Sequence, residues 1–431
     1  MNISVFVLII SFVILLAVSV PISYSIGIAT ILTMLFTVQT GPAVTTVAQR
    51  MATGLDSFAL LAIPFFILSG KLMGRGGIAR RLINFAKVIV GVFPGGLAYV
   101  NVLACMFFGA ISGSAVAATS AIGGFMIPLM NKEGYDKNFN AAVNVTSATT
   151  GLLIPPSNIL IVYSLASGGV SIAALFIAGY IPGILVGLGL MGVCAVVAVR
   201  KKYPVGERLP VWEGVKKFFD AIPSLLLVVI VIGGIIAGIF TATEASAVAV
   251  IYSLLLAVVI YREVKVKELP DILLATVETT AIVMLLIGTS TAMSWIMSYE
   301  NLPQNVSAAL IAMTDSKVLI LLIINVLLLA VGTFMDMTPA VLIFTPIFLP
   351  VVIQLGLTPL HFGIIMVLNL CIGLCTPPVG SVLFVGCGIA KTTIVDVTRY
   401  LLPFFIVMIV VLMIITYIPE LTLFLPRLFG Y

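Results

Sequence analysis

The sequence predicts an all-α polytopic membrane protein whose helices form two inverted repeats. Three observations support this fold class. Hydrophobic residues make up 61% of the 431 residues and charged residues only 9%, whereas soluble domains carry about 25% charged residues. Apolar runs long enough to cross a bilayer as helices recur from one end of the chain to the other. Two segments of the chain also resemble each other at a fixed spacing.

The longest apolar runs are expected to be membrane-spanning helices outside the repeated segments. A helix needs about 20 apolar residues to cross a bilayer, and runs of about this length lie at 3–20, 171–199, 221–240 and 401–418. The chain is therefore expected to have five parts: N-terminal scaffold helices with a cytoplasmic amphipathic segment (1–96), a first repeat (97–168), scaffold and connecting helices (169–317), a second repeat (318–391) and a C-terminal helix (392–431).

The basic residues predict the orientation of the helices. Lys and Arg concentrate in the cytoplasmic loops of membrane proteins. If both termini lie outside, all of the 21 Lys and Arg residues except Arg50, Lys317 and Arg427 fall on the cytoplasmic side. The opposite orientation would reverse this bias. We therefore attribute the net charge of +5 to membrane orientation rather than to nucleic-acid binding, and we expect both termini outside.

An internal repeat links the two halves of the chain at an offset of 222 residues (350 − 128 = 222). The predicted orientation places an odd number of membrane crossings between the two copies, so they are inverted relative to each other. Inverted repeats are a recurrent plan of secondary transporters, whose ligand sites lie near the middle of the membrane where helices are broken. The recurring residues are Pro128, Gly134, Gly151, Pro155 and Pro156, which match Pro350, Gly356, Gly373, Pro377 and Pro378.

Each repeat begins with an expected re-entrant hairpin. The apolar segment 97–130 is interrupted by Gly-Ala-Ile-Ser-Gly-Ser at 109–114, and its two arms end on the same cytoplasmic side. A hairpin whose tip lies inside the membrane accounts for this pattern. The second repeat has a similar pattern at 318–353, with the tip expected at 332–339.

Each hairpin is followed by an expected broken helix. Residues 138–167 form a segment of about 30 residues, which is longer than one crossing requires at about 1.5 Å per residue, and it contains Gly-Leu-Leu-Ile-Pro-Pro-Ser at 151–157. The matching segment 362–390 contains Thr-Pro-Pro-Val-Gly at 376–380. Consecutive prolines remove backbone donors and leave carbonyl groups without helical partners. The sequence leaves open the alternative that the prolines only kink these helices.

The free carbonyl groups at the two breaks indicate two sodium sites. Unpaired carbonyls are costly in hydrocarbon unless a ligand binds them, and unwound carbonyls bind Na⁺ in transporters of this plan. One candidate site combines the carbonyls near Gly151 and Ile154 with Ser112 and Ser114 at the first tip. The other combines those near Gly373 and Thr376 with Gly332 and Asp336 at the second tip. A small-residue packing surface is the alternative for the two serines, whereas an acid inside an apolar stretch is usually functional.

The space between the two hairpin tips is predicted to bind a small organic anion. The half-helices after the breaks point their N-termini, with their partial positive charge, at this space. The membrane segments contain almost no Lys or Arg to hold a carboxylate, so we expect hydrogen bonds from Ser157, Asn158, Thr338 and Ser381. The sequence has no catalytic triad, metal cluster or phosphate loop, so we do not expect an enzyme. A channel or a structural membrane subunit is the alternative from another class.

Six motifs together resemble one known family over essentially the whole chain. The chain is similar to the large membrane subunit of tripartite ATP-independent periplasmic (TRAP) transporters, the DctM type, and within that family to the sialic-acid (SiaM) branch. Ala242 is a departure, because the family more often has proline between the two threonines of this motif. The motifs lie at 108–115, 128–135, 151–157, 241–246, 332–336 and 369–380.

The resemblance implies sodium-driven uptake of an organic acid through a bacterial inner membrane. The first candidate substrate is sialic acid (N-acetylneuraminate), and the expected cofactor is Na⁺, with two ions suspected. A small four-helix TRAP membrane subunit and a periplasmic substrate-binding protein would be partners, besides the surrounding lipid, and both termini would be periplasmic. The alternatives are a C4-dicarboxylate TRAP permease and a stand-alone sodium/carboxylate symporter.

Motif matching also implies which residues bind the ions and how the chain moves. One sodium site would comprise Gly109, Ser112, Gly151, Ile154 and Pro155, and the other Gly332, Gly373, Thr376 and Val379. The family mechanism would be an elevator, in which the hairpins and broken helices move as one body against fixed scaffold helices.

Overall fold

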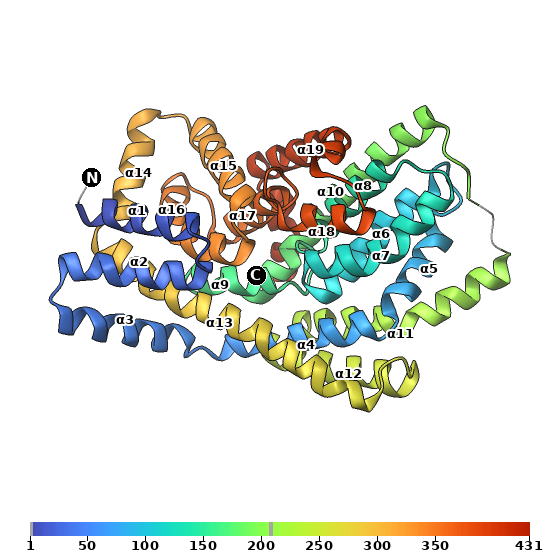
Figure 1. Cartoon of the computed structure of the whole chain (residues 1–431), viewed down its shortest axis with the longest axis horizontal. Coiled ribbons are helices and arrows are strands. Elements are labelled where there is room, and N and C mark those ends of the chain that lie inside the picture. Colours follow the sequence, from blue (N-terminus) through green and yellow to red (C-terminus); the bar gives the residue numbers. More distant parts are fainter. Residues whose placement is uncertain (1–2, 207–209) are drawn as a thin grey trace.

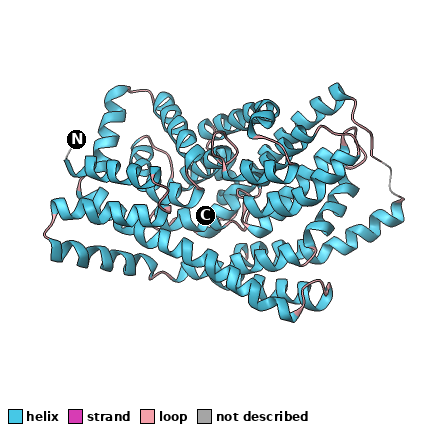
Figure 2. Cartoon of the chain, viewed as in Figure 1, coloured by secondary structure: helices cyan, strands magenta, loops and turns pink. Residues whose placement is uncertain are grey.

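The computed structural model describes residues 3–206 and 210–431. Within these ranges the chain consists of helices and loops, with one isolated β-bridge between Pro94 and Val205 (Figure 2). Eight of the described helical segments are long and apolar enough to cross a membrane. The prediction of an all-α polytopic membrane protein is therefore confirmed.

Five helices precede the first repeat. The loop at Asp56 and a 3₁₀ turn (Phe58–Leu61) separate the third from the fourth, which continues in nearly the same direction (Figure 1). The fifth is amphipathic: Ile78 and Leu82 are buried, whereas Arg80 is exposed. The helices are α1 (Ile3–Ala17), α2 (Ile22–Thr37), α3 (Thr40–Leu55), α4 (Ala62–Arg75) and α5 (Ile78–Val90).

The first repeat contains the two interrupted segments that the sequence predicts. Gly113 adopts a φ of +61°, which favours glycine, and it ends the first arm of the hairpin. Ser114 and Asp136 cap the helices that follow them. The helices are α6 (Gly96–Ser112), α7 (Ala115–Lys132), α8 (Lys137–Thr150) and α9 (Asn158–Ala166), followed by the long α10 (Ile172–Lys201).

The second half of the chain follows the same order. Thr241 and Glu244 form a capping box that begins the second helix of this half, so this turn keeps its cap with Ala242 between the two threonines. The helices before the second repeat are α11 (Val211–Ile236), α12 (Ala242–Leu254, extended by a π-helical turn to Ile260), α13 (Leu269–Tyr299) and α14 (Leu302–Met313). Those of the repeat and beyond are α15 (Lys317–Phe334), α16 (Met337–Gln354), α17 (Pro359–Gly373), α18 (Ser381–Ala390), α19 (Ile394–Tyr417) and α20 (Glu420–Leu428).

The structural repeat is longer than the sequence repeat. Both ends of α7 and α16 differ by 222 residues (337 − 115 and 354 − 132), and so do the starts of α10 and α19 (394 − 172). Gly134 and Gly356, which precede α8 and α17, have φ angles of +83° and +79°. Cys371 on α17 approaches its own counterpart on α8, because its Sγ lies 3.4 Å from the Thr149 carbonyl oxygen. The axis that relates the two repeats therefore passes between the ends of α8 and α17.

The interruptions differ in detail from the predicted ones. The first tip is expected over 109–114 and the second over 332–339, but helix continues through Gly109 and Gly332 and is lost only at Gly113–Ser114 and Met335–Asp336. A single glycine weakens a helix by about 0.5–1 kcal/mol without breaking it. The second broken helix starts at Pro359, because Thr358 caps it, rather than at 362. The C-terminal segment holds two helices instead of one, since α19 ends just before Ile418-Pro419.

The two repeats interlock. Helix α9 packs on α16 and α17 of the second repeat, and α18 packs on α7 and α8 of the first. Tyr163 of α9 lies over Gly363 of α17 and donates a 2.6 Å hydrogen bond to the Pro359 carbonyl. Each repeat thus supplies part of the packing of the other, and the hairpins and broken helices form one body.

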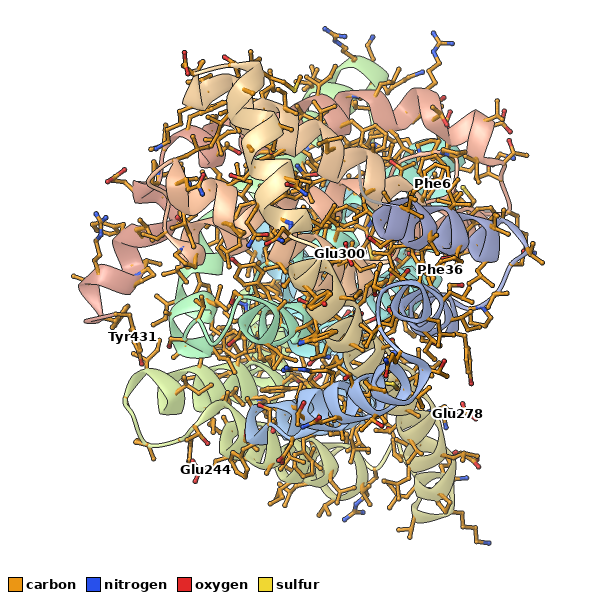
Figure 3. The ribbon with its side chains drawn as sticks, turned by 90° about the vertical axis from the view of Figure 1, so that its left-hand side faces the viewer. Phe6, Phe36, Glu244, Glu278, Glu300 and Tyr431 are labelled. Carbon is orange, nitrogen blue, oxygen red and sulfur yellow. The ribbon has the colours of Figure 1, made fainter. Side chains whose placement is uncertain are left out.

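A layer of long helices lies against this body. Helices α2, α3, α4, α12 and α13 run along the lower side of Figure 1, and α13 packs on α2, α3 and α4. Phe6 and Phe36 lie at the periphery of the molecule in Figure 3, and they are 53% and 68% exposed. Exposed apolar side chains of this kind suit a surface that faces lipid.

Candidate functional site

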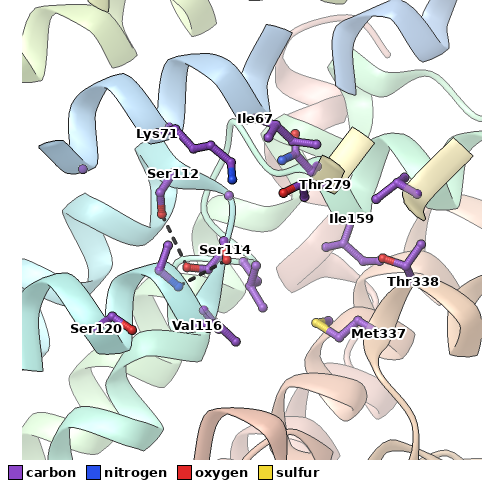
Figure 4. A pocket seen from close by; sticks show the side chains of 18 of the residues that line it. Ile67, Lys71, Ser112, Ser114, Val116, Ser120, Ile159, Thr279, Met337 and Thr338 are labelled. Atoms are coloured by element: carbon purple, nitrogen blue, oxygen red, sulfur yellow. Dashed lines mark hydrogen bonds between the residues drawn. The ribbon is translucent and has the colours of Figure 1, made fainter. Parts of the chain in front are cut away.

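A cavity of about 700 Å³ lies between the layer of long helices and the interlocked repeats, which touch each other beside it. One wall consists of one face of α4 and part of α13. The opposite wall consists of the two hairpin tips and the N-terminal ends of α9 and α18 (Figure 4). The cavity thus lies where the sequence predicts an anion to bind, between the tips and the restarted half-helices.

The two hairpin tips present polar groups to the cavity. At the first tip, Ser114 Oγ accepts a 3.3 Å hydrogen bond from the Ala117 amide, and Ser112 Oγ donates a 3.4 Å bond to the Ser114 carbonyl (Figure 4). Asp336 occupies the equivalent N-cap position of α16, one offset after Ser114 (336 − 114 = 222). Its side chain is exposed to the cavity. The repeat therefore places a serine hydroxyl and a carboxylate at matched positions.

In each repeat one pair of glycines lets the hairpin contact the broken helix closely. A Cβ atom on Gly151 would lie 2.3 Å from Gly109 Cα, and one on Gly373 would lie 2.6 Å from Gly332 Cα. These distances leave no room for any side chain. The four predicted glycines are thus brought together in two backbone contacts, one behind each tip.

The helix breaks carry carbonyl groups that are not used by the fold. Within the described residues, the carbonyl oxygens of 151–156 and 374–379 accept none of the backbone or side-chain hydrogen bonds. Both breaks contain a cis Pro-Pro bond, at Pro155-Pro156 and Pro377-Pro378. Thr376 Oγ1 donates a 2.7 Å bond to the Ile372 carbonyl, which leaves the lone pairs of this hydroxyl available. Each break therefore offers several oxygen ligands beside a glycine pair.

Three of the predicted anion-binding side chains have polar atoms without a partner. Ser157 Oγ, Asn158 Oδ1 and Ser381 Oγ are buried and make no hydrogen bond within the described part of the chain. Buried polar atoms are usually paired, so these atoms suit a bound ligand. Asn158 and Ser381 line the cavity together with Thr338, whereas Ser157 lies behind the lining.

The predicted residues thus fall into two groups. One group lines the cavity: Ser112, Ser114, Asn158, Asp336, Thr338 and Ser381. The other lies behind the tips, at the breaks and glycine pairs: Gly109, Gly151, Ile154, Pro155, Ser157, Gly332, Gly373, Thr376 and Val379. The Ile154 side chain packs against α10 at Gly183, and the Val379 side chain is 42% exposed. Both side chains are hydrocarbon, so only the carbonyl groups of these two residues are suited to bind an ion.

Two charged lining residues were missed by the sequence analysis. Lys71 and Arg75 on α4 face the cavity, although their charges had been counted only as signs of a cytoplasmic segment. Their spacing with Ile63 and Ile67 is the signal that was available, because residues three or four apart share one face of a helix. The cavity wall is therefore more basic than expected.

Comparison with protein families gives one match over nearly the whole chain. The family model described as "Tripartite ATP-independent periplasmic transporter, DctM component" matches residues 9–421.

Three curated relatives are similar over almost their full length. A Salmonella typhimurium protein, the uncharacterized YgiK, is 57% identical over 97% of this chain and 96% of its own. The C4-dicarboxylate TRAP transporter large permease DctM of Rhodobacter capsulatus is 39% identical over 96% and 97%. The sialic acid TRAP transporter large permease SiaM of Vibrio cholerae is 38% identical over 97% of each chain.

A solved structure supports the fold at lower similarity. The YdaH transporter of Alcanivorax borkumensis superimposes with a TM-score of 0.61 over 86% of each chain, at 15% sequence identity. The two proteins therefore share the arrangement of helices.

Proposed function

Because the chain belongs to the DctM-component family of tripartite ATP-independent periplasmic transporters and is a large permease subunit rather than an enzyme, we propose that it imports an organic acid anion by sodium-coupled secondary transport. The observation that carries this proposal is the cavity between two matched hairpin tips and two half-helix N-termini. A membrane cavity bordered by helix breaks is the usual ligand site of inverted-repeat transporters.

The two sodium ions would bind behind the tips. Each break supplies carbonyl oxygens without hydrogen bonds, and each glycine pair brings a hairpin arm against those oxygens. Thr376 adds a hydroxyl at the second site and Ser112 at the first. Carbonyl and hydroxyl oxygens are the ligands that hard cations prefer.

Asp336 would couple the ions to the anion. Its carboxylate shares the cavity with Asn158, Thr338 and Ser381, which would bind the substrate. Two negative groups in one cavity repel each other strongly at low dielectric. A sodium ion beside Asp336 would remove this repulsion, so anion binding would follow sodium binding.

The substrate proposed first is sialic acid, with a C4-dicarboxylate as the alternative. The relatives named for these two substrates are 38% and 39% identical, so overall similarity does not separate them. A cavity of about 700 Å³ is within the range of about 300–1,000 Å³ that holds small organic ligands. The cavity has room for the larger sialic acid as well as for the smaller acid.

The transport movement would be an elevator within a tripartite complex of a bacterial inner membrane. The interlocked repeats would slide past α4 and α13, with both termini periplasmic. A small four-helix subunit and a periplasmic binding protein are the partners that the family implies. The alternative is a stand-alone sodium/carboxylate symporter, which needs neither partner.

Two sodium ions are energetically sufficient for accumulation. If they accompany one monoanion, the net charge moved is worth about 2.3 kcal/mol per 100 mV. A tenfold sodium gradient adds about 1.4 kcal/mol for each ion. Together these forces allow accumulation of about several thousandfold.

The decisive experiment is uptake of labelled sialic acid into proteoliposomes that contain this chain and its small subunit. We expect uptake only when a sodium gradient and the binding protein are both present. Uptake without the binding protein would favour the stand-alone symporter. If a C4-dicarboxylate is taken up and sialic acid is not, the substrate is a C4-dicarboxylate and the sodium-coupled mechanism is retained. Uptake that is equally fast with and without a sodium gradient, for any substrate, would contradict the mechanism.

Replacing the first proline of either break is expected to weaken sodium dependence. Pro155→Ala or Pro377→Ala restores a backbone N–H that competes with Na⁺ for the free carbonyls. Because one hydrogen bond contributes about 0.5–1.5 kcal/mol, the sodium concentration for half-maximal uptake should rise by about threefold to tenfold. Pro350→Ala, within the intact helix α16, is the matched control and should leave the sodium titration unchanged. If the sodium titrations of the Pro155→Ala and Pro377→Ala variants are unchanged, the prolines only kink these helices and do not affect sodium binding.

A further inference from the structure

Lys71 is a cation that the proposed ion sites do not use. It belongs to a single face of α4 that lines the cavity together with Ile63, Ile67, Gly70, Gly74 and Arg75. Lys71 is half-buried, whereas Arg75, one turn further along, is exposed. Ionisable side chains on the apolar helices of a membrane protein usually serve a ligand or a pathway.

Helix α4 is held close to the first hairpin tip at the level of Lys71. A Cβ atom on Gly70 would lie 2.9 Å from the Ser112 carbonyl oxygen and 3.1 Å from Ser112 Cα. The absence of a side chain at Gly70 therefore lets the two backbones touch. In Figure 4 the amino group of Lys71 points from α4 toward the tip at Ser112 and Ser114.

The lining of the cavity contains more positive than negative side chains. Lys71 and Arg75 contribute two positive charges and Asp336 one negative charge, and no other lining residue carries a formal charge. Among the described residues, none of the salt bridges within 4 Å involves Lys71. The N-termini of α9 and α18 add partial positive charge on the opposite wall. An anion between the two walls would therefore meet Lys71 on one side and the half-helices on the other.

We propose that Lys71 binds the carboxylate of the transported organic acid, an inference that rests on the proposed function and adds a cationic ligand from the α4 side of the cavity. Lys71 lies on α4, outside the interlocked repeats, so this contact exists only while the tips lie against α4. Lys71 is therefore a binding residue of this conformation and is left behind when the repeats move. Arg75 lies one turn further along the same face and also lines the cavity.

The test compares binding of an acid with binding of its methyl ester to the purified complex of large and small subunits. The probe pairs are sialic acid or succinate and their methyl esters, measured by calorimetry in saturating sodium. We expect the native complex to prefer the acid by about tenfold or more, because a hydrogen bond between charged groups is stronger than a neutral one. Lys71→Gln should lose most of this preference, and Lys71→Arg should retain it. Lys216→Gln, at an exposed position of α11, is the control and should behave as the native chain.

The outcomes separate this inference from the proposed function. If the native complex neither binds nor transports any organic acid, the proposed function fails. If the native complex prefers the acid and Lys71→Gln keeps that preference, only the role of Lys71 is overturned. If Lys71→Gln does not fold, acetylation of the native complex decides: bound acid should slow the modification of Lys71 but not of Lys216. Equal modification of Lys71 with and without the acid would overturn the proposal.

A structural role for Lys71 is tested separately through Glu278. This acid on α13 attracts Lys71 electrostatically, but it is exposed at the periphery and does not line the cavity (Figure 3). Glu278→Gln should therefore leave the preference for the acid unchanged. A loss as large as that of Lys71→Gln would assign Lys71 to this pair and would overturn its role in binding the acid.

Discussion

Gly373→Ala is expected to lower sodium-dependent uptake by at least about tenfold, and Gly151→Ala should do the same in the other repeat. The added methyl group on Gly373 would lie 2.5 Å from the Gly332 carbonyl carbon, and the one on Gly151 would lie 2.3 Å from Gly109 Cα. Both contacts are with backbone, which cannot rotate away as a side chain can. Overpacking of this kind costs about 1–3 kcal/mol, and it moves the hairpin arm away from the carbonyls at the break.

Two glycines of the same repeats provide matched controls. A Cβ atom on Gly124 of α7 or on Gly388 of α18 would meet nothing within 4 Å. Gly124→Ala and Gly388→Ala should therefore transport as the native chain does. Uptake and the amount of protein in the membrane should be measured together, so that loss of function is separated from loss of insertion. Normal uptake by Gly373→Ala and Gly151→Ala would show that the close contacts are not needed for ion binding.

Asp336→Asn is expected to make the affinity for the anion much less dependent on the sodium concentration. Asparagine is about as good an N-cap residue as aspartate, so α16 should begin in the same place while its carboxylate is lost. Without that charge, the anion no longer depends on sodium to remove a repulsion inside the cavity. Sodium is expected to raise the anion affinity of the native chain by some factor. In the Asp336→Asn variant this factor should be smaller by about tenfold or more.

Uptake by the Asp336→Asn variant should also be impaired without loss of expression. The direct measurement is a titration of anion binding at several sodium concentrations. Ser114→Ala gives a useful comparison, because it changes the matched position of the first repeat without removing a charge. A variant at Asp336 that transports normally and keeps the native sodium dependence would remove this residue from the coupling mechanism.

The positions of the glycines and prolines made much of the fold predictable from sequence. Gly134 and Gly356 have the left-handed backbone angles that favour glycine, and the Pro-Pro pairs break α8 from α9 and α17 from α18. Such backbone requirements leave few choices of residue, so they appear as identities between the repeats.

The full length of the repeat could not be seen in the sequence, because several residue types can occupy the N-cap position of a helix. Asp136 matches Thr358, and Ser171 matches Thr393, as N-caps at the same offset. These residue types all accept a hydrogen bond from the first turn of a helix. The positions therefore share a function without sharing an identity, and a comparison of letters misses them.

The part of the site on α4 was missed for a different reason. Counting Lys and Arg predicts which loops are cytoplasmic, but it does not say which way a charged residue near the end of a helix points. Lys71 lies at the cavity because Gly70 allows α4 to touch the Ser112 backbone, 42 residues later in the sequence (112 − 70 = 42). The spacing of Ile63, Ile67 and Lys71 shows that they share one face of α4, but which element that face meets depends on tertiary packing.

The interlocked repeats also constrain how the chain can be made. Tyr163 finds its hydrogen-bond partner 196 residues later, and Cys375 contacts the Val145 carbonyl across 230 residues. While the ribosome is still synthesising the second half, the first half therefore has a helix break whose packing partners do not yet exist. In lipid such exposed backbone is costly, so the nascent first repeat would need a chaperone, the insertion machinery or the proposed small subunit beside it until α16 and α17 arrive.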